Sequence, residues 1–401
     1  MTGRHALSFG SVALVRYIFG SGHMPLERSD PTVAPLYRST GGSEHVTPHW
    51  SVEMLEPSDP RLEALWTDLQ ARGGVGSPFL TWQWFRSLAE APELSAGVRV
   101  IVVSRSRQPV GLLPLEWSRR GGSITTVGIA GWTWLSPDHL DVVSVEPPGE
   151  VARALLRHLI SRSDWDAIDL DGLTPDGGLA RAARELLRPP RIAPRKPENV
   201  IIPYVDLVDR DEVELLPGRK LRKRVRKHLA EAVADGGGCL LEVEPDRAAS
   251  ALDELMRLHQ RRYGSVATAF STPARRTFHK MAVARMAAAG MARIYRLSSG
   301  GRDVALEYDL VFDGKVYAYS AGIDPEARGS PGLALTGHIV LTAAAEGLRE
   351  YDMLRGDEPY KLRFASGQRC DLRLRGLRLT PVSALRASGE VLRRRWPLRR
   401  G

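Results

Sequence analysis

The segment best suited to chemistry joins a predicted strand, a glycine-containing loop and a predicted helix. The strand is expected over 316–324, the loop over 325–331 and the helix over 332–348. The first N–H groups of a helix have no intrahelical partners, and the helix dipole favours negative charge at that end. A phosphate bound here would contact a cation, glycines and helix amides. The residues that supply these groups are Arg328, Gly329, Ser330, Gly332, Leu333 and Ala334. These residues predict an anion site, although an ordinary strand-to-helix turn has the same pattern.

A carboxylate in a predicted strand is the candidate general base. In the strand expected over 304–312, alternation places Glu307 and Asp309 on one face and apolar or aromatic side chains on the other. Burial beside apolar neighbours raises the pKa of a carboxyl group and suits it to accept a proton near neutral pH. The alternative is a charge at a solvated strand end.

Polar side chains also occur in and after the next predicted strand, 350–354. Asp352 lies within this strand and is a candidate member of the catalytic group. Lys361 follows the strand, and its ammonium group can bind a phosphate or a carboxylate as a point charge. For each of these residues the alternative is a surface turn with local ion pairs.

The net charge of +9 is concentrated in two short segments. Residues 217–228 carry seven Lys and Arg and no acid, the tail from 381 carries six Arg and one Glu, and the rest of the chain is close to neutral. Apolar residues at every fourth position predict an amphipathic helix over 219–235. Lys220 and Arg224 lie on its polar faces, where they are expected to bind phosphates of a nucleotide-, lipid- or tRNA-linked substrate. A solvated basic face is the alternative.

Length and composition limit the class of protein. A chain of 401 residues suits two or three domains, and 43% hydrophobic with 26% charged residues is typical of a soluble globular protein. Two cysteines cannot form a disulfide framework and indicate a reducing compartment. No run of 18 apolar residues predicts a membrane-spanning helix, and no Cys/His cluster has zinc spacing. A cytoplasmic protein without a metal, with a peripheral membrane location as an option, is therefore expected.

The order of predicted elements divides the chain into segments. These are a disordered leader at 1–48, an N-terminal α/β domain at 49–190, a linker at 191–197, a C-terminal domain at 198–380 and a basic tail at 381–401. With an offset of 194 residues, the helix, strand and strand expected over 62–69, 98–103 and 109–117 fall on similar elements of the second half. This repeat predicts two copies of one α/β fold with mixed, twisted sheets flanked by helices. A chance alignment of two α/β segments is the alternative.

The second half resembles a known superfamily. Residues 304–364 resemble the closing part of Gcn5-related N-acetyltransferases (GNAT), and more closely the CelD type associated with cellulose biosynthesis, which is related to FemAB aminoacyl transferases. The matching segments are 317–324, 330–332, 351–364, the basic helix at 219–229 and Leu-His-Gln-Arg-Arg-Tyr at 258–263. The resemblance covers 198–380 well and 50–190 only in its plan. It implies two GNAT-like domains in tandem.

The resemblance also implies site roles. The loop after the fourth GNAT strand holds the pyrophosphate of coenzyme A, usually as Gln/Arg-x-x-Gly-x-Gly/Ala, so acetyl-CoA is the expected acyl donor at 328–334. Here the glycine comes one residue late, and Pro331 lacks an N–H donor. Glu307 would deprotonate an acceptor amine, and a tyrosine near the thioester sulfur would act as the general acid. Tyr360 is the first candidate for this acid; Tyr319, also a candidate substrate-binding residue, is the second.

Three functions follow from these expectations. The first is an N-acyltransferase that uses acetyl-CoA and an amine acceptor, such as an amino sugar or another cell-envelope precursor. The second is a FemAB-like transferase, in which the basic helix engages an aminoacyl-tRNA or a lipid-linked precursor. The third is a non-catalytic accessory protein of polysaccharide biosynthesis, which the displaced glycine favours. The sequence indicates neither the acceptor nor the oligomeric state.

Overall fold

Helices and strands alternate through the part of the chain that the computed structural model describes, which is residues 49–119, 123–234, 239–264 and 269–383. The first half contains β1 (Trp50–Leu55), α1 (Arg61–Ala71), η1 (Pro78–Leu80), α2 (Trp82–Ala89), α3 (Pro92–Ser95), β2 (Val98–Arg105), β3 (Gln108–Ser118), β4 (Thr126–Ile129), β5 (Val143–Ser144), α4 (Pro148–Ser161), β6 (Ala167–Leu173), α5 (Gly178–Leu186) and β7 (Ile192–Pro194). The predicted leader at 1–48 and most of the predicted basic tail lie outside the described residues.

The second half contains the segment in which a chemical site was predicted. Its elements are β8 (Glu198–Asp206), α6 (Glu212–Leu215), α7 (Arg219–Ala234), β9 (Cys239–Glu242), η2 (Pro245–Arg247), α8 (Ala248–Tyr263), α9 (Pro273–Ala288), β10 (Ala292–Ser299), β11 (Arg302–Phe312), β12 (Lys315–Ile323), α10 (Pro331–Ala345), β13 (Glu350–Asp352), α11 (Lys361–Phe364) and β14 (Gly367–Arg378). The helix predicted over 332–348 is thus α10. It ends at Ala345, and Gly347 follows with φ +79°, as a C-terminal glycine signal predicts.

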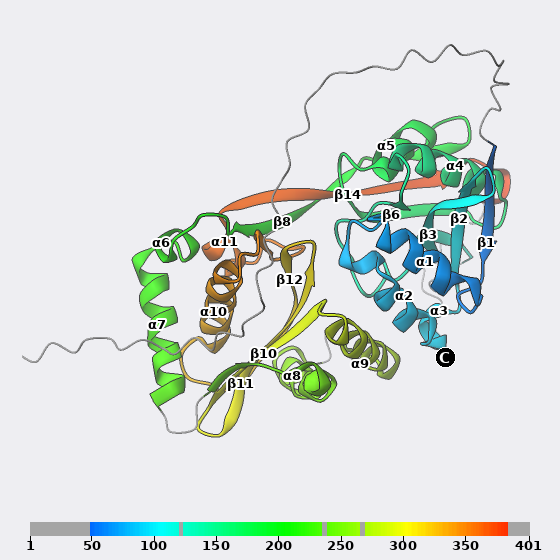
Figure 1. The fold of residues 1–401 in the computed structure, drawn as a ribbon. Coiled ribbons are helices and arrows are strands. Elements are labelled where there is room, and N and C mark those ends of the chain that lie inside the picture. The colour runs from blue at the N-terminus through cyan, green and yellow to red at the C-terminus, as the bar shows by residue number, and fades with distance from the viewer. Residues whose placement is uncertain (1–48, 120–122, 235–238, 265–268, 384–401) are drawn as a thin grey trace, which may run out of the picture. The chain divides into compact units, whose positions relative to one another are not determined.

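The strands form one mixed sheet that runs through both halves of the chain. Its order is β1-β2-β3-β4-β6-β14-β8-β13-β12-β11-β10-β9, with β5 on β3 and β7 on β14. The last strand, β14, lies between β6 of the first half and β8 of the second, as Figure 1 shows. The segment 191–197, predicted as a linker, contains β7, which pairs with β14. The prediction of a mixed α/β fold with helices on the sheet is confirmed.

A gap in this sheet forms beside the predicted anion loop. The parallel strands β12 and β13 pair only at 315–317 and 350–352. Beyond Tyr317, β12 continues to Ile323 with β11 as its partner, and a bulge interrupts that pairing between Tyr308 and Asp309. The two parallel strands therefore part before the N-terminus of α10, which follows β12 along the chain.

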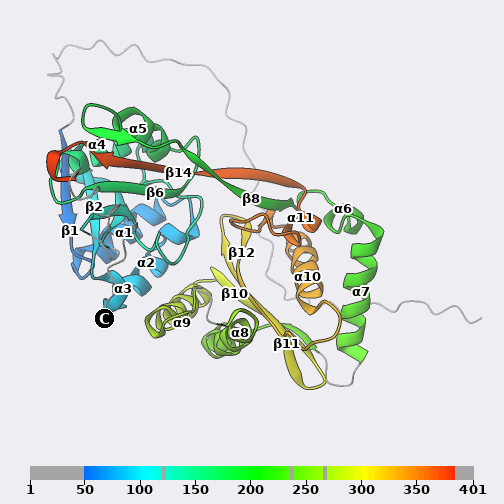
Figure 2. The ribbon, with the colours of Figure 1, turned by 180° about the vertical axis from the view of Figure 1, so that it is seen from behind.

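Helices cover both faces of the second half of the sheet. In Figure 2, α7 and α10 lie on one side of β10–β12, and α8 and α9 lie on the other. Residues of β11 alternate between two hydrophobic clusters: Leu306 and Tyr308 pack with the α8 and α9 side, and Ala305 packs with the α10 side. Gly337 of α10 lies close to α7, because a Cβ added there would come within 2.8 Å of the Val225 side chain. The α10 helix is thus held tightly between the sheet and α7.

Candidate functional site

A cavity of about 660 Å³ lies where β12 and β13 part. Its walls come from β11, β12, the N-terminus of α10, the turn after β13 and the end of α8. The first half of the chain adds a segment between β4 and β5 that includes Trp134, Leu135, Ser136 and Asp138. Both halves therefore build one cavity.

Most of the predicted site residues line this cavity. They are Glu307, Tyr319, Gly329, Ser330, Gly332, Leu333, Tyr360 and Lys361. Five other predicted residues are outside its lining: Lys220, Arg224, Arg328, Ala334 and Asp352. The sequence thus locates the cavity, while several of the individual roles change in the structure.

The N-terminus of α10 offers two free amides to the cavity. Pro331 is the first helical residue and has no N–H. The Ala334 amide donates to the Ser330 carbonyl at 3.1 Å, so it is not available to a ligand. Gly332 and Leu333 keep N–H groups that the first turn of a helix leaves without intrahelical partners. This end of the helix fits one phosphate group, with fewer donors than the sequence predicted.

Glu307 is a buried carboxyl group that faces the cavity. Its side chain accepts hydrogen bonds from the Tyr351 hydroxyl and, at 2.9 Å, from the Thr336 hydroxyl. It is 4% exposed, and burial raises its pKa, which the two hydroxyl donors partly oppose. The alternative of a solvated strand end is therefore excluded. A carboxyl group with a raised pKa suits proton transfer near neutral pH.

Two tyrosines of the cavity wall have raised pKa values. Tyr360 is 47% exposed, and burial of its hydroxyl together with the charge of Glu307 raises its pKa. Burial also raises the pKa of Tyr319, whose hydroxyl donates to the Leu135 carbonyl at 3.3 Å. Both phenols therefore stay protonated at neutral pH. Tyr360 is the one whose position near Glu307 suits a proton donor.

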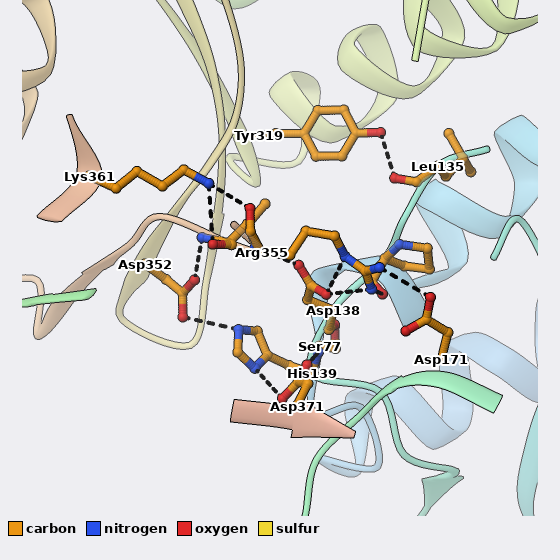
Figure 3. Close-up of polar contacts among 12 residues, drawn as sticks. Ser77, Leu135, Asp138, His139, Asp171, Tyr319, Asp352, Arg355, Lys361 and Asp371 are labelled. Carbon is orange, nitrogen blue, oxygen red and sulfur yellow. Dashed lines mark hydrogen bonds and ion pairs between the residues drawn. The ribbon is translucent and has the colours of Figure 1, made fainter. Parts of the chain in front are cut away.

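Lys361 is occupied by the protein itself. Its ammonium group donates to the Arg355 carbonyl at 2.6 Å and pairs with Glu358 at 3.1 Å. These contacts fasten the turn between β13 and α11, and the left of Figure 3 shows the one between Lys361 and Arg355. The side chain is 6% exposed. Its role as a substrate-binding point charge is thus replaced by one in shaping the cavity wall.

Asp352 belongs to a buried ion cluster behind the cavity. Its Oδ2 lies 3.0 Å from His139 Nε2, and His139 Nδ1 lies 3.3 Å from Asp371 of β14. Arg369 adds a second cation at 3.2 Å from Asp352. Although burial lowers the pKa of His139, its hydrogen bonds and charge interactions with Asp352 and Asp371 raise that pKa to about 10. Asp352 therefore holds His139 in place and is not available as a base in the cavity.

A second part of this cluster reaches the cavity. Arg355 binds Asp138 with its Nε at 2.8 Å and with its backbone N–H at 2.9 Å, and it binds Asp171 at 3.1 Å (Figure 3). Burial raises the pKa of Asp138 to about 6 although Arg355 opposes the shift. Since Asp138 and Asp171 belong to the first half and Arg355 to the second, these contacts fix the 134–139 segment against the C-terminal half.

Sequence reasoning missed this cluster. His139 lies in the segment between β4 and β5, and its two ion partners are Asp352 and Asp371. Its partners are more than 200 residues away in the sequence, so no local signal marks them. In the structure, the backbone of this segment stands out: Ser136 and His139 have positive φ angles of 50° and 57°, and such conformations often occur near functional sites. The sequence does not show these angles.

The basic face of α7 lies outside the cavity lining. Lys220, Lys223 and Arg224 are exposed, while Leu221 and Val225 pack against the core. Arg226 pairs with Glu212 at 2.7 Å. Among the described residues, Lys220, Lys223 and Arg224 have no acidic side chain within ion-pair distance. These cations belong to a surface separate from the cavity.

Two further features are absent from the described residues. No group of three His, Cys, Asp or Glu side chains within them is arranged to hold a metal ion. No helix in that part of the chain has both the length and the apolar character needed to span a membrane.

Comparison with known proteins identifies the fold of the cavity-bearing segment. Residues 219–362 match the family model described as an acetyltransferase (GNAT) domain. This segment contains Glu307, the α10 N-terminus, Tyr360 and Lys361. A comparison with curated proteins found no match.

Solved structures extend the similarity to both halves. The chain resembles FemX with a TM-score of 0.54 at 13% identity, covering 80% of this chain and 97% of that one. It resembles L-PGS from Bacillus licheniformis with a TM-score of 0.52 at 13% identity, covering 83% and 96%. The C-terminal domain of a putative lysylphosphatidylglycerol synthetase from Agrobacterium fabrum gives 0.51 at 13%, covering 82% and 96%. The chain thus has the fold of two GNAT-like domains in tandem, as the sequence predicted.

Proposed function

We propose that this protein is a GNAT-type N-acyltransferase of the CelD type that transfers an acetyl or other acyl group from a coenzyme A thioester to an amine. One observation carries the proposal: the buried carboxyl group of Glu307, which has no counter-ion among the described residues, and the free amides of a helix N-terminus face the same cavity. An amino sugar or another cell-envelope precursor with a primary amine fits this chemistry.

In the proposed reaction, some residues transfer protons and others position the two reactants. Glu307 accepts a proton from the acceptor ammonium group, which frees the nitrogen lone pair for attack on the thioester carbonyl carbon. The C–N bond forms and the C–S bond breaks. Tyr360 gives its proton to the departing thiolate, and the second proton lost by the acceptor nitrogen passes to the Tyr360 oxygen, which restores the phenol. The position of Tyr360 supports this role, because it lines the same cavity as Glu307. Positioning of the two reactants and proton transfer supply most of the rate.

The amides of Gly332 and Leu333 would hold a phosphate of the donor, and the helix dipole adds to their attraction. The 134–138 segment of the first half would form part of the acceptor site, since Trp134, Leu135, Ser136 and Asp138 line the cavity along with Arg355. In this proposal the tandem arrangement contributes to substrate binding, because the acceptor contacts both halves of the chain.

A second candidate is an aminoacyl-tRNA-dependent transferase. The observation that favours it is the exposed basic face of α7, together with an α10 N-terminus that has only two free amides. FemX and L-PGS share the tandem architecture, but identities of 13% extend only to the fold. In this reading, Lys220 and Arg224 contact phosphates of the tRNA.

One experiment separates the two donors. The melting temperature of the protein is measured with acetyl-CoA, with CoA and with bulk tRNA at several salt concentrations, for wild type and Gly332→Glu. The introduced carboxylate suits a helix N-terminus but repels a phosphate there. Gly332→Gln is the control, since it makes the same contact with the Ile323 side chain, which a Cβ at Gly332 would approach to 2.3 Å, but adds no charge.

For the CoA donor we expect stabilisation of roughly 2.7 kcal/mol at a hundredfold excess over Kd, which Gly332→Glu loses and Gly332→Gln keeps. Stabilisation by tRNA alone, falling steeply with salt and abolished by Lys220→Glu with Arg224→Glu, would replace the CoA proposal with the second candidate. No effect of any of these ligands would favour the non-catalytic reading.

A further inference from the structure

The environment of Glu307 differs from that of the other buried carboxylates of the site. Asp138 and Asp352 each have an arginine partner, at 2.7 Å and 3.2 Å. Among the described residues, no lysine or arginine lies within ion-pair distance of Glu307, which instead accepts from two hydroxyl groups, Tyr351 and Thr336. A carboxylate that is buried without a cation costs free energy when it ionises. The arrangement therefore needs a reason other than stability.

The two hydroxyl donors come from separate elements that are themselves rigidly packed. Tyr351 lies in β13 and is 0% exposed, and Thr336 lies in the second turn of α10 and is 6% exposed. Each binds a different oxygen of the carboxylate, Oε1 and Oε2 respectively. The plane of the carboxylate is therefore fixed between the strand and the helix, and each oxygen keeps one further lone pair for a ligand.

Hydroxyl donors and an arginine would affect a base differently. An arginine beside a carboxyl group commonly lowers its pKa so far that the group no longer accepts a proton at neutral pH. Neutral hydroxyls orient the carboxylate and stabilise its charge more weakly, so that burial keeps the pKa raised. Two hydroxyls thus provide orientation without removing basicity.

We infer that Tyr351 and Thr336 are positioning residues, which hold the Glu307 carboxylate toward the acceptor and set the pH at which it takes up a proton. This inference rests on the proposed function, in which Glu307 is the base. Neither hydroxyl touches the reacting atoms in this assignment, and each acts through Glu307.

Other titratable groups surround Glu307 and contribute to its pH response. Asp309 lies two residues along β11, is 0% exposed, and has a pKa raised by burial and by the charge of Glu307. Tyr295 is the register partner of Glu307 on β10, and Tyr360 approaches from the turn after β13. All three remain in the variants below, so their effects are common to every measurement.

The test compares hydroxyl deletions with a matched control. Tyr351→Phe and Thr336→Val remove the two donors, and Thr336→Ser restores one. Tyr308→Phe is the control, because Tyr308 is an equally buried tyrosine on β11 whose hydroxyl has no hydrogen-bond partner among the described residues. For each variant, kcat and KM are measured with acetyl-CoA across the pH range, with the amine acceptor established for the wild type.

Loss of a donor to the ionised carboxylate raises its pKa, so the acidic limb of the kcat/KM profile should move to higher pH. We expect Tyr351→Phe to lower the rate about tenfold on the acidic limb, with a smaller loss on the alkaline plateau and little change in KM for acetyl-CoA. Thr336→Ser should restore the profile that Thr336→Val alters. A Tyr351→Phe profile that overlays those of wild type and Tyr308→Phe would overturn the inference.

A second measurement does not require activity. Infrared difference spectra of wild type against Glu307→Gln isolate the carboxyl band of Glu307, whose titration is followed in each variant. A shift of that titration to higher pH in Tyr351→Phe supports the inference even if the wild type transfers no acyl group from acetyl-CoA, in which case only the proposed function fails. An unchanged titration overturns it.

Discussion

At the scale of single residues, the site is distinguished by how its buried acids are balanced. Asp352 is paired with His139 and Arg369, and Asp138 with Arg355, so their charges serve the structure. Among the described residues, Glu307 accepts hydrogen bonds from two hydroxyl groups and has no cation within ion-pair distance. Of these three acids, Glu307 is the one without a cation partner, and it lines the cavity, which is the pattern expected when function and stability compete.

Because Glu307 has no cation partner among the described residues, the Glu307→Gln substitution should have different effects on activity and on stability. Acyl transfer should fall about a hundredfold to ten-thousandfold, because the general base is lost. The raised pKa of Glu307 means that the folded protein binds a proton more tightly than the unfolded chain does. Its contribution to folding therefore falls as pH rises above the unfolded pKa, and the amide removes that loss.

The measurements are kcat and the melting temperature of Glu307→Gln and wild type at pH 5 and pH 8. We expect a melting temperature at pH 8 that is equal to or above that of the wild type. An inactive variant that melts much lower at both pH values would instead assign Glu307 a purely structural role.

At the scale of elements, the 134–139 segment depends on a histidine held between two carboxylates. His139 is buried between Asp352 and Asp371, and its pKa is raised to about 10. A raised pKa stabilises the fold fully below the unfolded value, and this stabilisation is lost as pH rises through the folded value. The clamp on the 134–139 segment should thus weaken between about pH 6.5 and about pH 10.

The free energy of unfolding should therefore fall across this pH range by more in the wild type than in His139→Asn. Asparagine tolerates the positive φ of 57° at this position but does not titrate. Urea unfolding at several pH values measures the difference. His158→Gln is the control, because burial lowers the pKa of that residue, in the direction opposite to the shift of His139. Parallel curves for wild type and His139→Asn would contradict the assignment of His139 as a charged clamp.

Elements with a local signal were predicted, and those defined by distant pairing were not. The helices α1, α7 and α10 were predicted from nearby residues, and so was the alternation that places Glu307 on one face of β11. The His139 cluster joins residues from β13 and β14 to a segment more than 200 positions earlier. Lys361 was expected to meet a ligand because sequence alone does not show that nearby carbonyl groups occupy its ammonium.

At the scale of the whole molecule, the final strand decides how the two halves depend on each other. The repeat in the sequence predicted two domains, and the tandem fold is confirmed. The repeat did not indicate that β14 lies between β6 and β8. In this pairing Leu374 lies opposite Leu170 and Asp371 lies opposite Val200, so each pair joins residues that are far apart in the sequence. Arg373 of β14 also pairs with Asp169 of β6 at 2.6 Å. A strand from the end of the chain therefore completes the sheet of the first half.

This connection predicts that the N-terminal half does not fold independently when the chain is cut before β8. A fragment of residues 49–196 lacks β14, which leaves the β6 edge without its partner, β7 without any strand partner and Asp169 without Arg373. Unpaired backbone groups and uncompensated buried charge both destabilise a fold. We expect residues 49–383 to unfold in one cooperative transition, and the fragment to show none.

Calorimetry and circular dichroism of the two proteins test this dependence. A third protein, in which a flexible linker joins residues 367–383 to the end of the 49–196 fragment, should recover a cooperative transition because it restores β14 beside β6. Recovery would show that one strand, and not the whole C-terminal half, is required. A 49–196 fragment that melts at the temperature of the intact protein would instead establish two independent domains, and the shared cavity would then depend on the ion cluster around Arg355 and His139 alone.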